Sequence, residues 1–154
     1  MGVYSFKSSG KTSGEMLSEL TSFTPLPVGI STPLKLDNKN LFVMHYSVAD
    51  QVHDNLRNLL LTNWGERVGF YYFGANLREL TADFSSIELF DEAAIERIRK
   101  ATSTWMPFIS LNDFVSETDN QTNKNTGIIR IKITYNVSQL DVENKALQIS
   151  LYVI

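Results

Sequence analysis

Apolar and polar positions repeat with a helical period in one central segment of the chain. Five apolar residues recur there every three or four positions: Val48, Val52, Leu56, Leu59 and Leu60. This spacing gathers them into one stripe and predicts an amphipathic helix over Val48–Thr62. Ser47 is the expected N-cap, and Gly65 is the expected stop signal beyond the helix. Four polar residues are expected on the opposite, solvent-facing side: Asp50, Asp54, Arg57 and Asn58.

A second helical pattern runs from Glu92 to Ser103, with Asp91 as the expected cap. Its apolar face consists of Ala94, Ile95, Ile98 and Ala101, and Trp105 extends that face. The charge order suits the helix dipole, because the acidic residue Glu92 comes first and the basic residues Arg97, Arg99 and Lys100 come later.

The last third of the chain alternates between apolar and polar residues and predicts strands. Strands are expected over Phe108–Val115, Gly127–Val137 and Ala146–Ile154, with a polar loop over Ser116–Thr126. Upstream, the polar turn Asp37-Asn38-Lys39-Asn40 separates two apolar runs and predicts a short hairpin or two extended strands. The order of elements predicts an α+β fold, with central helices packed on a C-terminal antiparallel sheet. We expect one domain over residues 28–154, preceded by an extended N-terminal arm over residues 1–27.

The strand predicted over Ala146–Ile154 has two interpretations. As the last strand it is a candidate for a sheet edge, where unpaired backbone groups accept a strand from another chain. Alternatively it is an internal or covered strand. The same choice applies to residues 1–27, which are either a frayed terminus or an arm that orders on a neighbour.

Composition narrows the functional classes. The net charge of −3 provides no broad basic field for nucleic acid. The chain has no cysteine and only two histidines, His45 and His53, so we expect no metal site and no cofactor. No apolar run is long enough to span a bilayer, and the start has no signal-peptide core, so we expect a protein made and used in the cytoplasm, without a membrane partner.

The most unusual segment is Leu59–Leu77, in which Gly65-Glu66-Arg67 is followed by the aromatic run Phe70-Tyr71-Tyr72-Phe73 and Gly74. Four consecutive aromatic residues are hard to bury together in a small domain, and aromatic residues are favoured in interface cores. The alternative is a plug of the protein core beside a solvated Glu66–Arg67 pair.

This segment resembles the wedge family of contractile injection systems, which includes the T-even phage baseplate wedge subunit and its type VI secretion counterpart. The resemblance rests on leucines closing a helix, Gly65-Glu66-Arg67, Phe73-Gly74 and Leu77, and covers residues 28 to 154. Trp64 and Tyr71 stand where the family often has proline. Family members carry a second motif, Glu-Pro-Arg, at the start of the terminal sheet. Here Met106-Pro107-Phe108 follows Trp105 at that place, so only the proline is kept.

The resemblance implies a fold similar to the inner, strand-exchanging domain of tail sheath subunits. It implies a non-enzymatic structural subunit of a phage tail baseplate, assembled in the host cytoplasm, that nucleates the sheath. The implied partners are the tail sheath protein and other wedge proteins, with their helical core bundle, and the tail tube is a further candidate. The implied interface residues are Gly65, Glu66, Arg67, Phe73, Gly74, Leu77, Trp105, Met106, Pro107, Phe108, Ile131, Ile149, Leu151 and Val153.

Two rival functions remain open. The first is a type VI secretion baseplate component, which shares the fold and the nucleating role. The second is a peptidoglycan-degrading lysozyme, because the family is often labelled "lysozyme-like". A glycosidase needs two carboxyl groups across a cleft, and the candidates are Glu66, Glu79 and Asp83. We expect these acids to lie on a solvated surface.

Overall fold

A computed structural model describes residues 26–38, 41–82, 87–120 and 127–153. The protein is α+β, as the sequence predicts. In chain order the elements are β1 (Gly29–Ile30), β2 (Met44–His45), α2 (Val48–Leu61), α3 (Leu77–Ala82), α4 (Ile87–Trp105), β3 (Ser110–Asn120), β4 (Gly127–Val137), the 3-10 turn η1 (Ser138–Leu140) and β5 (Val142–Val153).

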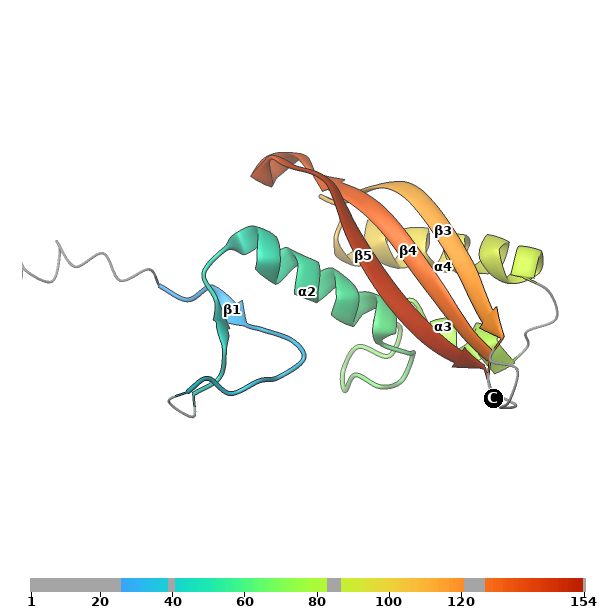
Figure 1. The fold of residues 1–154 in the computed structure, drawn as a ribbon, viewed down its shortest axis with the longest axis horizontal. Coiled ribbons are helices and arrows are strands. Elements are labelled where there is room, and N and C mark those ends of the chain that lie inside the picture. Colours follow the sequence, from blue (N-terminus) through green and yellow to red (C-terminus); the bar gives the residue numbers. More distant parts are fainter. Residues whose placement is uncertain (1–25, 39–40, 83–86, 121–126, 154) are drawn as a thin grey trace, which may run out of the picture.

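The main body has two layers, an antiparallel sheet of order β3-β4-β5 and the helices that cover one of its faces (Figure 1). Alternate residues of the central strand β4 point into the helical layer, and all of these residues from Ile129 to Val137 are buried. They meet the apolar stripe of α2, represented by Leu56, and the inner face of α4, represented by Ile98. The core therefore lies between the sheet and the two long helices. The predicted apolar faces are confirmed for Val52, Leu56, Leu59 and Leu60 of α2 and for Ala94, Ile98 and Ala101 of α4. Val48, at the start of α2, is 47% exposed, and Ile95 is only half-buried.

The N-terminal segment lies beside this body, next to the first half of α2 (Figure 1). β1 and β2 pair antiparallel, and a bridge between Leu36 and Phe42 continues the hairpin toward its turn. This confirms the predicted hairpin. Residues 39–40 of its turn, and residues 1–25 of the predicted arm, lie outside the described residues.

Three details of the sequence prediction are wrong: the end of β3, the helix cap and the exposure of one residue of α2. The expected loop over Ser116–Thr126 is a strand as far as Asn120, because β3 pairs with β4 over its whole length. Asp91 does not cap a helix, since α4 begins at Ile87; instead the Asp91 carboxylate accepts a hydrogen bond from Ser116 Oγ at 2.7 Å. Asp54, expected on the solvated face of α2, is 7% exposed.

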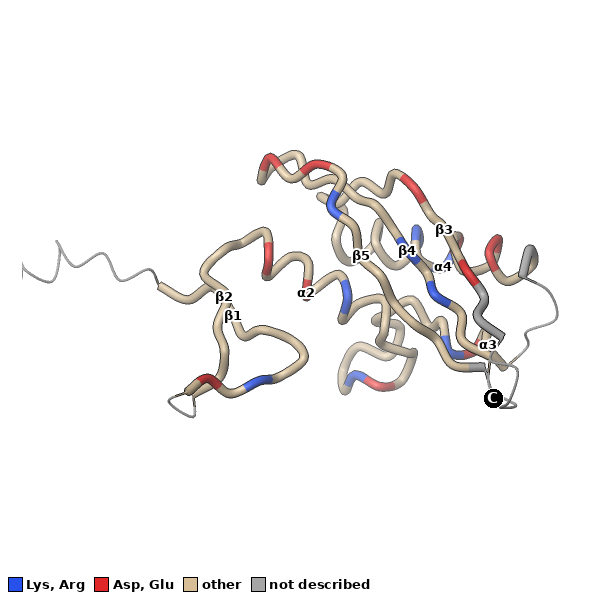
Figure 2. The backbone as a smooth tube through the Cα atoms, in the orientation of Figure 1, with Lys and Arg blue, Asp and Glu red and all other residues tan. Residues whose placement is uncertain are grey.

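Basic and acidic residues are both scattered over the described part of the tube (Figure 2). No helix in the described part of the chain is both long and apolar enough to cross a membrane.

Candidate functional site

The loop after α2 folds back against the end of that helix. The backbone N–H of Ala75 donates to Leu59 O at 3.2 Å, and that of Asn76 donates to Thr62 O at 3.3 Å. Within the loop, Gly65 N–H donates to Tyr71 O at 2.8 Å. These bonds satisfy carbonyl groups at the open end of the helix and close the segment from Thr62 to Asn76 into a compact unit. We call this unit the signature loop, because it contains Gly65-Glu66-Arg67 and Phe73-Gly74.

Gly74 is required by close backbone approach. Its φ is +107°, which residues with a side chain rarely adopt, and a Cβ at this position would lie 2.1 Å from Thr62 O. Gly74 is also buried. Its place in the motif is therefore explained by the path of the loop over the helix end.

Glu66 and Arg67 do not pair with each other in the described structure. Both Glu66 carboxylate oxygens accept hydrogen bonds from Asn63, at 2.8 Å from its backbone N–H and at 2.9 Å from its side-chain amide. These bonds lower the pKa of Glu66, with a smaller contribution from the charge of Arg78. The Arg67 guanidinium lies 4.0 Å from the centre of the Phe73 ring, a cation–π contact. Thus Glu66 braces the loop backbone, and Arg67 covers its only half-buried aromatic side chain.

The other aromatic residues of the loop face outward. Phe70, Tyr71 and Tyr72 are 57%, 63% and 70% exposed. Tyr72 makes edge contacts with Trp64 and Tyr71, while Phe70 packs edge-on against Trp105. A plug of the protein core is therefore excluded for these three residues. With Trp64, Phe73, Trp105 and the 38%-exposed Phe108, they form what we call the aromatic surface.

A polar cluster fixes one side of the aromatic surface. Arg97 on α4 donates to Asn76 O at 2.7 Å and to the Glu79 carboxylate at 2.8 Å, and its guanidinium faces the Trp64 ring at 5.8 Å. The Trp64 indole N–H in turn donates to Gly74 O at 3.2 Å. Sequence reasoning missed this cluster, because Arg97 is 21 residues away from Asn76 and has the pattern of an ordinary helix surface charge.

Two grooves flank Trp105. The larger, of about 540 Å³, has Gly74, Ala75 and Ala101 on its lining, with Trp64 and Tyr72 opposite α4. The smaller, of about 370 Å³, is lined by Asn55, Asn58, Leu59, Arg67, Phe73, Trp105, Met106 and Phe108. Of the three residues at the family's Glu-Pro-Arg position, Met106 is buried, while Pro107 and Phe108 are exposed.

A second candidate site lies at the outer edge of β5. In the described part of the chain, no strand pairs with that edge. A groove of about 290 Å³ runs beside it, formed by Ser150, Leu151 and Tyr152 of β5 and by residues of α2, α3 and their connection: Leu60, Leu61, Asn63, Leu77, Arg78 and Thr81. The groove is mainly apolar, and Leu61 at its rim is 40% exposed.

The sequence-predicted interface residues of α3 and of the sheet divide between core and surface. Leu77, Ile131 and Ile149 are 1%, 0% and 3% exposed, so their side chains belong to the core. Leu151 is half-buried in the edge groove, and nothing is described for the side chain of Val153.

The carboxylates proposed for glycoside hydrolysis do not form a described catalytic pair. A catalytic acid requires a raised pKa, whereas the pKa of Glu66 is lowered. Glu79 is bound to Asn76 and Arg97, at 2.6 and 2.8 Å. Asp83 lies outside the described residues. Among the residues that are described, no group of three His, Asp or Glu is placed to hold a metal ion.

Comparison with solved structures shows that the fold is shared. One match is a chain of the anti-feeding prophage baseplate, determined by cryo-electron microscopy with six-fold symmetry. It is 21% identical, has a TM-score of 0.57, and the alignment covers 71% of this chain and 83% of that chain. Another is a candidate tail lysozyme from Geobacter sulfurreducens, 21% identical with a TM-score of 0.51, covering 69% of this chain and 89% of that chain. No model of a known protein family matches the sequence, and neither does any curated protein.

Proposed function

We propose that this chain is a non-enzymatic structural subunit of a contractile-tail baseplate, and that it nucleates the sheath by accepting a strand at the outer edge of β5. The observation that carries the proposal is the outer edge of β5, which no described strand pairs with and which has an apolar groove beside it. The fold shared with a chain of the anti-feeding prophage baseplate supports a place in a baseplate. The wedge motif of the signature loop supports the same family.

The geometry favours the β5 edge over the β3 edge. β3 carries the charged residues Asp113 and Glu117 along its length, and charged side chains protect a sheet edge from pairing. Both edge strands have a register shift against β4, but in β5 this shift and the charged residues Glu143 and Lys145 lie at the start of the strand. Residues 146–152 of β5 include no charged side chain. An added strand would form backbone hydrogen bonds worth about 1 kcal/mol each, and its alternate side chains would enter the groove.

In this proposal the aromatic surface binds the other wedge proteins. Exposed Phe70, Tyr71 and Tyr72, with Trp64 and Phe108, supply rigid apolar contact area of the kind found at interface hot spots. Because Met106 is buried and the exposed Phe108 stands in place of the family's base, the contact here uses apolar Phe108 rather than an ion pair. The chain then links wedge proteins on one side to sheath and tube on another, within a particle built in the host cytoplasm.

The strand-acceptor proposal is tested at Leu61. Leu61→Asp places a charge at the rim of the groove and leaves the core untouched, because Leu61 is 40% exposed. Deleting β5 would be less informative, since Leu147 and Ile149 would leave the core. Tails assembled with Leu61→Asp should carry a baseplate and a tube but little sheath, as counted by electron microscopy.

Val115→Asp is the matched control. Val115 is 51% exposed on β3, the opposite edge strand, and the substitution likewise replaces an apolar side chain by a carboxylate. It should leave sheath attachment unchanged. Normal sheaths on Leu61→Asp tails, with the variant protein present in the baseplate, would overturn the strand-acceptor role.

The wedge-binding role is tested separately. Glu66→Ala with Arg67→Ala should weaken baseplate assembly by loosening the signature loop, and Tyr72→Ala should do so by removing contact area alone. Baseplates that form normally with both variants would refute this part. The type VI alternative is distinguished by gene neighbourhood. The lysozyme alternative predicts clearing of peptidoglycan by the purified protein in a zymogram, and we expect none.

A further inference from the structure

The N-terminal hairpin is attached to the body by polar contacts rather than by the core. The apolar core begins at Val52, and no described residue of the hairpin, 28–38 and 41–46, belongs to it. Instead the hairpin exposes many of its large apolar side chains: Val28, Ile30, Leu34, Leu36, Leu41, Phe42 and Tyr46. An element held in this way is among the parts of a protein that open most easily.

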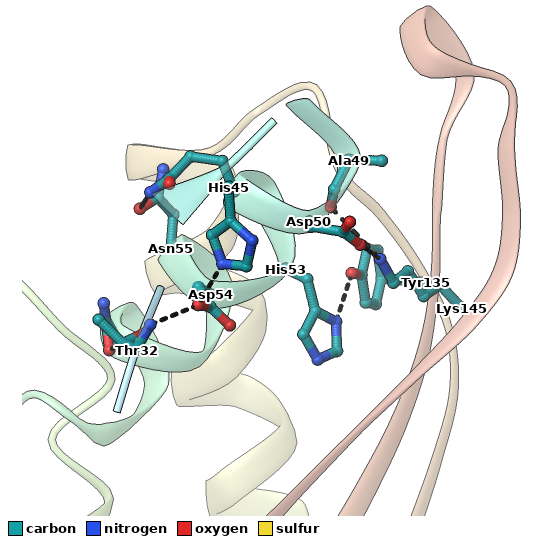
Figure 3. A network of polar contacts seen from close by, with 11 residues as sticks. Thr32, His45, Ala49, Asp50, His53, Asp54, Asn55, Tyr135 and Lys145 are labelled. Atoms are coloured by element: carbon teal, nitrogen blue, oxygen red, sulfur yellow. Dashed lines mark hydrogen bonds and ion pairs between the residues drawn. The ribbon is translucent and has the colours of Figure 1, made fainter. Parts of the chain in front are cut away.

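A single carboxylate oxygen joins both strands of the hairpin to α2. Asp54 Oδ2 accepts a hydrogen bond from the Thr32 backbone N–H, which follows β1, at 2.7 Å. The same oxygen lies 2.7 Å from His45 Nε2 in β2. Figure 3 shows both contacts converging on Asp54 from the two sides of the hairpin. Asp54 is almost fully buried, so these bonds are shielded from water and charge-assisted.

Two further described contacts between the hairpin and α2 are weaker. Thr32 Oγ1 reaches Asn58 Oδ1 only at 3.4 Å. Gly29 packs tightly on the Gln51 side chain, and Gln51 Oε1 is buried there without a hydrogen-bond partner among the described residues. A buried acceptor without a hydrogen bond costs free energy, which disfavours the packing of the hairpin on α2 at this point.

The helix itself is anchored to the sheet by a different set of groups. Lys145 of β5 binds Asp50 at 3.0 Å, and His53 Nδ1 lies 2.9 Å from the Tyr135 hydroxyl on β4 (Figure 3). Opening of the hairpin therefore leaves the contacts of α2 with the sheet in place.

We propose that the hairpin is a hinged arm clasped to α2 by Asp54, able to leave the helix while α2, α4 and the sheet stay folded. The arm can then change position when the protein enters an assembly, which reorients its exposed apolar side chains. This inference does not depend on the strand-acceptor role of β5.

The test uses the natural absence of cysteine, which allows two unique spin labels. Labels at Leu36→Cys on the arm and Lys132→Cys on the outer face of β4 report the arm position by pulsed electron spin resonance. Both residues are exposed. The protein should give a narrow distance distribution, and Asp54→Ala should broaden it at least twofold. Asp50→Ala is the control, because it removes a carboxylate of the same helix that faces β5, and it should leave the distribution unchanged.

Hydrogen exchange of the same variants separates hinging from unfolding. In Asp54→Ala the Thr32 amide should exchange at least tenfold faster, while amides of β4 such as Ile131 and Ile133 keep their protection. A narrow distribution in Asp54→Ala would overturn the hinge. Equal loss of protection in β4 would also overturn it, since Asp54 would then support the whole body rather than the arm.

Discussion

Replacing Gly74 by alanine tests whether the signature loop depends on close backbone approach. The methyl group would lie 2.1 Å from Thr62 O, where ordinary contact begins near 3.4 Å, and the neighbour is backbone rather than a flexible side chain. Relief of this clash has to move the loop away from the end of α2. The hydrogen bonds from Ala75 to Leu59 and from Asn76 to Thr62 would then lengthen or break.

The expected loss of stability is the sum of a backbone strain and two lost hydrogen bonds. A side chain at positive φ costs about 1–2 kcal/mol, and the loss of two backbone hydrogen bonds costs about 1 kcal/mol each. Gly74→Ala should therefore lower the free energy of unfolding by about 3–4 kcal/mol. For a domain of this size that corresponds to a fall in Tm of about 10 °C. Urea denaturation and calorimetry on the purified protein measure both quantities.

Gly69→Ala is the matched control within the same loop. Gly69 has a φ of +83°, but a Cβ there meets nothing within 4 Å. Gly69→Ala should therefore lower the free energy of unfolding only by the cost of a side chain at positive φ, about 1–2 kcal/mol. The steric argument would be refuted if the two variants lost the same stability, because the contact with Thr62 would then contribute nothing.

Three further predictions concern His53, Tyr135 and Arg97. Burial, and next the charge of Lys145, lower the pKa of His53. The unfolded chain therefore binds more protons than the folded protein as the pH falls through and below 6.5, and the free energy of unfolding should decrease there. His53→Gln should remove this pH dependence of the free energy of unfolding, measured by urea denaturation across about pH 5–8. Tyr135→Phe should cost about 1 kcal/mol by urea denaturation, because it deletes the hydroxyl bonded to His53, while Tyr152→Phe, at a 64%-exposed position, should be neutral. Arg97→Lys keeps the charge but loses the planar guanidinium, whose Nη1 donates to both Asn76 O and the Glu79 carboxylate, so amides of the signature loop should exchange faster.

The parts of the fold that the sequence predicted are those where one face of an element is apolar. The stripe of α2 and the alternation of β4 required a buried face, and both were found. β3 was predicted too short, because residues 116–120 are polar on both faces and carry no alternation. Their strand conformation comes from pairing with β4, from Ser116 opposite Ile131 to Asn120 opposite Gly127. Because this pairing depends on the tertiary structure, no local sequence pattern predicts it.

The aromatic surface could be predicted only in part. Four consecutive aromatic residues indicated that some are exposed, but not which ones. The structure divides them, because Phe73 turns inward under Arg67 while Phe70, Tyr71 and Tyr72 turn outward. The groups that hold the surface, Arg97 and its partners, come from another helix and depend on how α4 packs beside the loop.

The polar side of α2 shows why periodicity alone assigned one residue wrongly. Asp50, Asp54, Asn58 and Thr62 follow at four-residue intervals, which is what a solvated helix face looks like. In the structure these residues make different contacts: Asp50 binds Lys145 of the sheet, Asp54 binds the hairpin, and Thr62 Oγ1 donates to the backbone oxygen of Asn58 at 2.6 Å.

The helix therefore joins hairpin, sheet and signature loop through one polar stripe, while its apolar stripe fills the core. Burial of Asp54 opposes its ionisation, but the hydrogen bonds from His45 and Thr32 outweigh this effect and lower its pKa. A carboxylate with a lowered pKa contributes stability above pH of about 4, and that stability is lost as the pH falls through the folded-state value. Asp54 is therefore ionised near neutral pH, so protonation of Asp54 would release the hairpin only under acidic conditions.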